Sequence, residues 1–186
     1  MNALDALLTR RSSPRLCAPA PSPEQLENIL QAGLRAADHA LLRPWRMLSI
    51  SGEGLDALGE LFVRAELAAG KELDTTQEQK LRDKPKRAPL IIVALAKLSD
   101  HEKVPAIEQE YSAAAAVQAM SLAAYAQGLG SMWRTGGKAY DATVRQGLGV
   151  AANEKIVGFL YLGTPSGPLK GLVEQRSQDF MQKWPS

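Results

Sequence analysis

The densest group of residues that could bind an anion lies close to the N-terminus. Arg10, Arg11 and Ser12 follow one another directly, and Pro14 prevents the preceding helix from continuing. Guanidinium groups present planar forks of N–H donors that match phosphate oxygens, and a serine hydroxyl can add a further hydrogen bond. An arginine pair at a helix end can instead simply complement the helix dipole and stay in water. The sequence therefore suggests a phosphate site, with a solvated helix end as the alternative.

Other kinds of catalytic site find little support. His39 and His101 have no Cys or His at ligand spacing, so we expect no metal. Cys17 lies in a Pro/Ala connector and no Gly-x-Ser-x-Gly elbow is present, so we do not expect nucleophilic catalysis. Gly128-Leu129-Gly130 follows a predicted helix and precedes a predicted strand, the reverse of the order in a dinucleotide-binding loop.

Length and charge point to a single domain, 1–186, without a polyanion-binding face. The chain carries 22 Lys and Arg against 20 Asp and Glu, a net charge of +2. This near balance predicts neither a nucleic-acid partner nor a membrane partner. A single cysteine excludes an intrachain disulfide, and no leader-like or membrane-spanning segment is recognisable, so we expect a cytoplasmic protein.

Hydrophobic periodicity and capping residues predict a chain of mixed helices and strands. Ser22, Pro23 and Gln25 form a typical helix start, and Asp141 is a second candidate N-cap. Residues 90–96 are continuously apolar, which indicates a buried strand at the centre of the sheet. Further helices are predicted before Pro14, to near Arg35, and at 55–69, 105–127 and 141–148, and further strands at 45–51, 131–135 and 156–162.

Two segments are expected outside the core. Residues 70–87 are strongly polar and are predicted to form a solvated loop or a flap. Their basic end, 80–87, contains acidic residues and no aromatic residue, which argues against nucleic-acid binding. The tail, 165–186, carries large apolar residues that we expect to pack on a partner subunit.

The order of the small motifs resembles that of the FMN-dependent nitroreductase family. The N-terminal helix runs into Arg10-Arg11-Ser12-Ser13, and the segment from Arg35 to Pro44-Trp45 follows the outline of a second family motif. The long helix leaves through a glycine-rich turn toward Trp133. The likeness extends from Ala3 through Pro165 and is greatest to the short bacterial branch of NAD(P)H nitroreductases.

The resemblance implies an α+β fold, an α/β/α sandwich around a mostly antiparallel sheet, and a homodimer with one FMN at each of two subunit-interface sites. Arg35 and His39 would reach the flavin from the same or the partner subunit. The implied FMN contacts are Arg10, Arg11, Ser12, Arg35, His39, Trp133, Arg134 and Thr135. The implied contacts to the nicotinamide nucleotide are Ala123, Ala124, Tyr125, Ala126, Gln127 and Gly128.

One departure from the family pattern concerns the edge of the flavin near N1 and O2. Pro14 stands where many relatives have a basic residue, and Arg15 comes one place later. A cation or N–H dipole is needed at that edge because the reduced flavin gains negative charge near N1. We favour Arg35 over Arg15 for this role, because Asp38 and His39 lie close to Arg35 in sequence and could orient it.

The resemblance implies that NAD(P)H passes a hydride to flavin N5 and is then replaced by an electron-poor acceptor such as a nitroarene or a quinone, in a ping-pong sequence. The cofactor carries this chemistry, so Glu108 and Glu110 are expected to be structural. Reductive dehalogenation and enone reduction are alternatives on the same fold. A non-enzymatic polyanion-binding protein is the alternative from another class.

Overall fold

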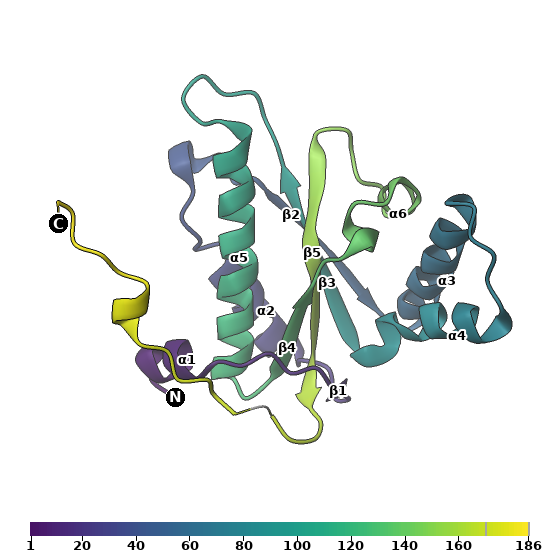
Figure 1. Cartoon of the computed structure of the whole chain (residues 1–186), viewed down its shortest axis with the longest axis horizontal. Helices are drawn as coiled ribbons and strands as arrows, with labels where there is room; N and C mark the ends of the chain where they lie inside the picture. Colours follow the sequence, from purple (N-terminus) through teal and green to yellow (C-terminus); the bar gives the residue numbers. More distant parts are fainter. Residues whose placement is uncertain (170, 186) are drawn as a thin grey trace.

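An antiparallel sheet forms the centre of the molecule (Figure 1). The structure is a computed structural model that describes residues 1–169 and 171–185. In the described chain the strands are β1 Leu16–Cys17, β2 Trp45–Ser51, β3 Leu90–Lys97, β4 Gly130–Arg134 and β5 Glu154–Pro165. The order is β1-β5-β3-β2, and β4 also pairs with β5. The predicted strands and the interior position of β3 are confirmed.

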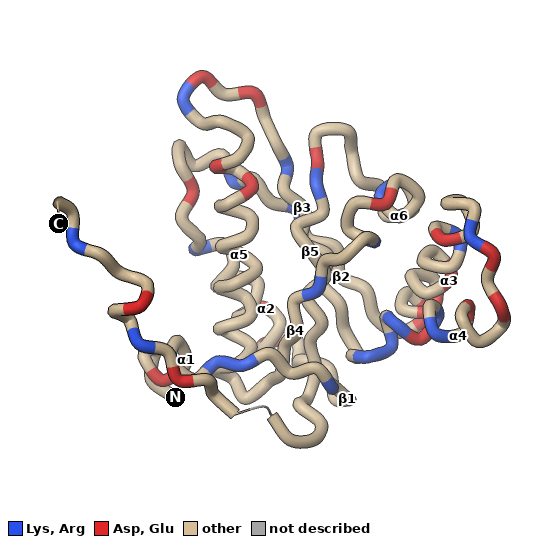
Figure 2. Tube along the Cα trace, in the orientation of Figure 1, with Lys and Arg blue, Asp and Glu red and all other residues tan. Residues whose placement is uncertain are grey.

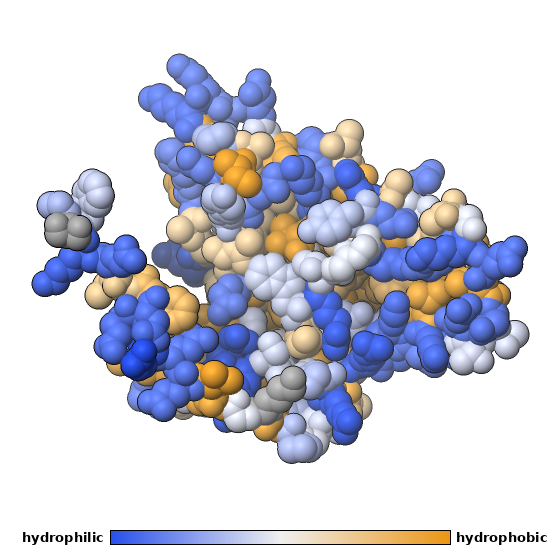
Figure 3. Space-filling model, in the orientation of Figure 1, coloured by the Kyte–Doolittle hydropathy of each residue, from blue (hydrophilic) through white to orange (hydrophobic). Residues whose placement is uncertain are grey.

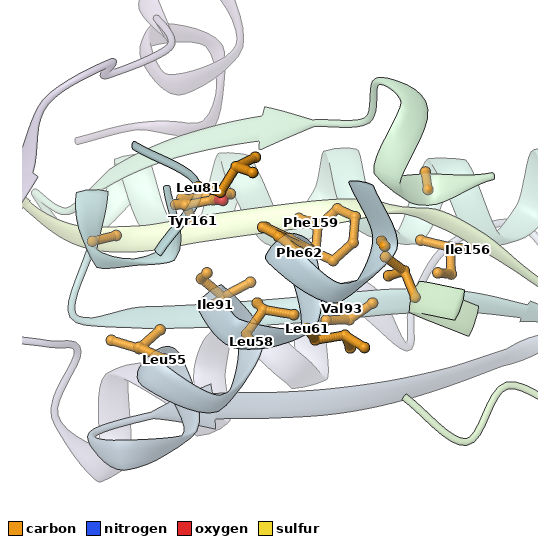
Figure 4. Packing of buried hydrophobic residues seen from close by; sticks show 14 of the residues in the cluster. Leu55, Leu58, Leu61, Phe62, Leu81, Ile91, Val93, Ile156, Phe159 and Tyr161 are labelled. Carbon is orange, nitrogen blue, oxygen red and sulfur yellow. The ribbon is translucent and has the colours of Figure 1, made fainter. Parts of the chain in front are cut away.

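Helices cover both faces of this sheet (Figure 1). The first face carries α2 Pro23–Gly33 and α5 Ala106–Ala126, with α1 Ala3–Thr9 packed on α5; the second carries α3 Glu53–Ala68, α4 Thr75–Asp83 and α6 Ala142–Gly147. Side chains alternate between the faces of a strand. Ile91 and Phe159 therefore pack toward α3 (Figure 4), whereas Ile92 and Leu160 pack toward α5. The implied α/β/α sandwich is confirmed.

Local sequence rules set the helix starts. Asn2, Ser22 and Asp74 each form a capping box. In it, the side chain of the cap residue accepts the backbone N–H of the third helical residue, whose own side chain accepts the backbone N–H of the cap residue. The Asp141 carboxylate accepts the backbone N–H of Val144 at 3.0 Å. The caps predicted at Ser22 and Asp141 are thus confirmed.

The alanine-rich helix α5 lies close against the sheet and α2. Ala113, Ala116 and Ala124 are fully buried, and a Cβ at Gly33 of α2 would lie 2.8 Å from the side chain of Met120. Small side chains on both helices therefore permit the close packing of α2 on α5. The exposed side of α5 carries Tyr111, which is 65% exposed.

Residues 70–87 differ from the predicted loop. They contain α4 and the 3₁₀ turn η2 Pro85–Arg87, and both Leu81 and Pro85 are buried. A Cβ at Gly59 of α3 would lie 2.6 Å from the carbonyl oxygen of Arg82, so α4 approaches α3 at backbone distance. A few buried contacts thus hold the mostly polar helix α4 against α3. Closure of residues 70–87 over a site stays a prediction.

The C-terminal tail runs away from the body of the molecule (Figure 1). It contains one short turn, η4 Ser177–Asp179. Its large apolar residues Val173, Phe180, Met181 and Trp184 are exposed, Trp184 to 96%. In the view of Figure 3 most other apolar residues lie in small groups among polar ones. Packing of the tail on a partner subunit stays a prediction.

Candidate functional site

The basic segment 10–12 is fixed at both of its ends. Before it, the hydroxyl of Thr9 lies 3.0 Å from the hydroxyl of Tyr125 on α5. After it, the backbone N–H of Ser13 donates to the carbonyl of Ser131 on β4 at 2.8 Å. These two ties hold the segment against α5 and β4, elements that are distant from it in sequence.

A second pair of contacts brings α5 and β4 together beneath this segment. The buried hydroxyls of Ser121 and Ser131 lie 2.7 Å apart. A Cβ at Gly130 would lie 2.9 Å from the Cβ of Ser13, so the absence of a side chain lets the strand approach the N-terminal segment. The local geometry therefore depends on small residues on both sides.

A pocket of about 320 Å³ opens between these elements. Its lining residues are Arg10, Ser12, Gln118, Ser121, Trp133 and Thr135. The structure thus brings the start of the chain together with the Trp133-Arg134-Thr135 segment, as the resemblance implies. Sequence analysis missed Gln118 and Ser121, whose spacing of three residues on α5 places them on one helix face.

The strand β4 separates this pocket from the opposite face of the sheet. Trp133 pairs with Leu160 and points toward α5, whereas Arg134 pairs with Phe159 and points toward α3. The Arg134 guanidinium lies 5.5 Å from the centre of the Tyr161 ring. Its side chain therefore does not share the pocket with Arg10. Arg11 is half-buried and does not line the pocket either.

The outer edge of β4 offers backbone hydrogen-bonding groups beside the pocket. The Ser131 carbonyl points away from β5, because it accepts from Ser13. Backbone groups of alternate residues on a strand point to the same side, so the N–H and C=O of Trp133 also face outward. An edge of this kind can bind a planar ligand through N–H and C=O groups, as it would bind another strand.

A bulge in β5 fixes the side chain of Trp133. The pairing of β3 with β5 shifts between Ala94 and Leu95, which leaves Val157 without a partner on β3. The Val157 carbonyl instead accepts the indole N–H of Trp133 at 3.3 Å. A Cβ at Gly158 would overlap that indole, so glycine is needed for the ring to lie there.

Arg35 and His39 lie elsewhere on the chain. His39 Nδ1 is 2.8 Å from a carboxylate oxygen of Glu108, near the start of α5. Ser121, in the pocket, is 13 residues further along the same helix, which is roughly 20 Å at the α-helical rise. Within one chain, His39 therefore does not join the pocket that Arg10 lines, and Arg35 lines a different pocket, together with Asp38 and Trp45.

The loop that carries His39 has an unusual backbone. Ala40, Leu41 and Arg43 all have φ between 50° and 61°, in the left-handed region that side chains disfavour. The Asp38 carboxylate accepts the backbone N–H of Arg43 at 2.7 Å and that of Leu42 at 3.2 Å. Asp38 thus holds the loop, and its expected role in orienting Arg35 stays a prediction.

The segment 123–128, implied to contact the nicotinamide nucleotide, ends α5. Ala124 is buried, and the Gln127 side chain donates to the carbonyl of Gln25 on α2 at 3.2 Å. Ala126 and Gly128 are exposed, and Gly128 has a φ of 79°. Most of this segment therefore serves the contact between helices, and its exposed positions lie at the end of α5.

The carboxylates near the start of the long helix each contact a side chain from another element. Glu108 pairs with His39 as described above, and Glu110 lies 2.6 Å from the ammonium of Lys155. Among residues 1–169 and 171–185, no group of His, Cys, Asp or Glu is arranged to hold a metal ion, and no helix has the length and hydrophobicity to span a bilayer.

The fold and the pocket together define a nitroreductase-type protein, and the chain belongs to the nitroreductase family, whose model matches residues 7–164. It is 48% identical over 165 residues to a protein of Escherichia coli (strain K12) named "Putative NAD(P)H nitroreductase YdjA", with 89% of each chain covered. A nitroreductase-like family protein from Bacillus cereus matches with a TM-score of 0.85 at 22% identity, over 100% of this chain and 97% of that one. A protein of Desulfovibrio desulfuricans, described as "a putative nitroreductase in complex with fmn", matches with a TM-score of 0.75 at 23% identity, over 100% of this chain and 98% of that one.

Proposed function

We propose that this chain is an FMN-dependent oxidoreductase that uses NAD(P)H to reduce a small electron-poor acceptor, such as a nitroarene or a quinone. Membership of the nitroreductase family and the names of the relatives support this class of reaction. The observation that carries the proposal is the pocket in which Arg10 and Ser12 lie beside the outer edge of β4 at Trp133. A cytoplasmic location would suit the reaction, because NAD(P)H is supplied there.

The residues of this pocket fit the two ends of FMN. A phosphate needs a cation and hydroxyl or N–H donors, which Arg10 and Ser12 can supply. A flavin ring needs donors and acceptors in its own plane, which the edge of β4 at Trp133 and Thr135 can supply. When bound, FMN would supply the redox chemistry, taking two electrons from NAD(P)H and giving them to the acceptor.

The chain's own residues then bind and orient the reactants. Arg10 and Ser12 hold the phosphate end, and Trp133, fixed through Val157, limits where the ring can lie. The described residues that line the pocket include no carboxylate and no imidazole. The protons that accompany reduction of an acceptor therefore come from water in this proposal.

A homodimer would complete the site. His39 lies roughly 20 Å along α5 from the pocket of its own chain, and Arg35 lines a different pocket, so a second copy would supply both residues if they contact the flavin. The exposed apolar tail would add contact area between the copies. The mass measured by light scattering at micromolar concentration tests this, and a monomeric mass would contradict it.

The nicotinamide nucleotide is proposed to reach the end of α5. Of the implied segment, Ala126 and Gly128 have the exposure to receive it, and Tyr125 connects that end to α1 through Thr9. NAD(P)H and the acceptor would bind one after the other at the same open face of the flavin site, which gives ping-pong kinetics.

The decisive experiment is a titration of the purified protein with FMN, followed by turnover. We expect a change in the flavin absorbance band on binding, oxidation of NADH or NADPH only when FMN and an acceptor are present, and parallel lines in double-reciprocal plots. Failure to bind FMN would refute the proposal. Oligonucleotide binding that falls steeply with salt would instead support the polyanion-binding alternative.

A further inference from the structure

A second cavity, of about 440 Å³, lies on the opposite side of β4 from the Arg10 pocket. Met132 and Arg134 of β4 point into this side of the sheet, and Lys84 and Arg87 reach it from the segment between α4 and β3. Figure 2 shows the run of basic residues in that segment. The cavity also touches Trp133, so it borders the proposed flavin site.

The lining of this cavity has an excess of positive charge. Among the cations that line the cavity, Lys138 is paired with a carboxylate, that of Glu66, at 2.8 Å. The same carboxylate also pairs with Lys71, at 2.6 Å. These two lysines lower the pKa of Glu66 to about 2, so one carboxylate balances two ammonium groups. Lys84 and Arg87 have no carboxylate partner within 4.0 Å among the described residues.

Three acidic groups near this segment, Asp56, Glu60 and Glu78, pair with cations that do not line the cavity. The Asp56 carboxylate lies 2.7 Å from Lys86, which does not line the cavity. Glu60 and Glu78 both pair with Arg82, at 2.6 and 2.9 Å. None of these three carboxylates pairs with a lysine or an arginine that lines the cavity.

Arg134, which also lines the cavity, adds a buried N–H donor to this group of cations. Its Nε is buried and has no hydrogen-bond acceptor among the described residues. A buried donor that lacks an acceptor is costly and is rare in proteins. Its guanidinium is 5.5 Å from the Tyr161 ring centre, and burial raises the pKa of the Tyr161 hydroxyl, which keeps that hydroxyl a neutral donor. Both groups would be satisfied by an anion.

The remaining surface of the cavity is apolar and aromatic. Phe62, Phe159 and Tyr161 form its inner wall together with Met132. Such a wall suits a planar ring, and the cations around it suit a carboxylate or phosphate attached to that ring.

We propose that this cavity binds the oxyanion of a ring-bearing reaction partner, a carboxylate or a phosphate, through Lys84, Arg87 and Arg134. The inference deepens the proposed function, on which it rests for the identity of the partner. The oxyanion belongs either to an aromatic carboxylate acceptor or to a phosphate of the nicotinamide nucleotide, and the two sources share the same recognition chemistry.

Calorimetry with two matched pairs of probes tests the proposal without turnover. The first pair is 4-nitrobenzoate and the neutral 4-nitrobenzamide; the second is adenosine 2′-monophosphate and adenosine. We expect the protein to bind the anion of at least one pair at least about tenfold more tightly than its neutral partner, as charge-assisted hydrogen bonds would give. The pair that shows the preference identifies the source of the oxyanion.

The double variant Lys84→Gln/Arg87→Gln should abolish that preference. Lys86→Gln is the matched control, because it removes a charge between the two positions without touching the cavity, and it should retain the preference. The proposal is overturned if the unmodified protein shows no preference, if the double variant keeps it, or if the control loses it equally. A parallel FMN titration of each protein reports separately on the proposed function.

Discussion

Trp133 donates its indole N–H to the backbone carbonyl of Val157, at 3.3 Å, across the point where β5 bulges away from β3. The bulge frees that carbonyl from the sheet ladder, and Gly158 leaves the space that the ring occupies. Because Trp133 lines both the pocket with Arg10 and the cavity with Arg134, this one contact fixes a residue that the two sites share.

Replacing Gly158 with alanine should displace Trp133. The added methyl group would overlap the indole, so the ring or β5 must shift, at a cost of about 1 to 3 kcal/mol in unfolding free energy. We expect altered tryptophan fluorescence and weaker FMN binding, measured together with urea unfolding. Gly171→Ala is the control, because a Cβ there meets no atom within 4 Å. Unchanged FMN affinity in Gly158→Ala would argue against a role for Trp133 in the flavin site.

The double variant Arg10→Ala/Ser12→Ala should weaken FMN binding by about 2 to 4 kcal/mol, because each charge-assisted phosphate contact contributes about 1.5 to 3 kcal/mol and such losses are not fully additive. The dissociation constant from fluorescence titration would therefore rise by at least about thirtyfold. Lys80→Ala removes an exposed charge on α4 and should leave the affinity unchanged. An equal affinity for the double variant would disprove the phosphate assignment.

Glu154 should make the fold sensitive to acid. Its buried carboxylate receives two hydrogen bonds from Arg46, both at 2.7 Å, and these lower its pKa from 4.5 to about 2 against the effect of burial. The carboxylate thus binds a proton less readily in the folded than in the unfolded chain. Its stabilisation, about 3 kcal/mol, is complete well above pH 4.5 and is lost as the pH falls toward 2.

The variant Glu154→Gln should therefore unfold about 3 kcal/mol more easily at neutral pH, and the difference should narrow to about 1 kcal/mol at pH 3. Denaturant unfolding at both pH values measures it. Glu110→Gln, which removes the more exposed pair with Lys155, should cost under about 1 kcal/mol at either pH. A difference for Glu154→Gln that does not change with pH would show that the carboxylate's charge is not what stabilises this region.

The elements with strong local signals could be predicted from the sequence. The capping residues Ser22 and Asp141 and the apolar run 90–96 define their elements without help from the rest of the chain. The segment 70–87 could not be predicted in the same way, because α4 is polar and is held by tertiary contacts of Leu81 and by the space at Gly59. Periodicity does not report contacts of that kind.

The candidate site also contains residues that a local pattern predicts and residues whose role depends on tertiary contacts. Arg10 and Ser12 stand out in the sequence because their types and spacing suit an anion. The contributions of Gln118 and of Gly158 depend on which face of α5 meets β4 and on a bulge in β5, and no local pattern encodes either. The face of β4 toward which Arg134 points likewise depends on strand register.

The docking of α4 should depend on Gly59. A methyl group there would lie 2.6 Å from the Arg82 carbonyl oxygen, so Gly59→Ala should push α4 away from α3. We expect faster hydrogen exchange in residues 75–87 and a loss of about 1 to 3 kcal/mol in stability. Gly54→Ala on the same helix meets only the Cγ2 methyl group of Ile50, at 3.2 Å, and its exchange pattern in residues 75–87 should match that of the unmodified protein. Unaltered exchange in Gly59→Ala would mean that this contact does not hold the segment.

A site built by two copies of the chain can be tested by complementation. Arg10→Ala/Ser12→Ala damages the pocket of its own chain, whereas Arg35→Ala damages the contribution that we propose for the partner's site. Each homodimer should bind FMN poorly. In a heterodimer of the two variants, the pocket of the Arg35→Ala chain would be intact and would receive an intact Arg35 from the other chain.

We therefore expect the doubly tagged, purified heterodimer to bind one FMN per dimer with the affinity of the unmodified protein. The second site carries both defects and stays empty. If Arg35 instead serves the site of its own chain, both sites of the heterodimer are defective and no FMN binding is recovered. A heterodimer of Arg10→Ala/Ser12→Ala with Lys80→Ala controls for the effect of mixing, since it keeps one undamaged site under either arrangement. Recovery in this control without recovery in the Arg35→Ala heterodimer would rule out the shared site.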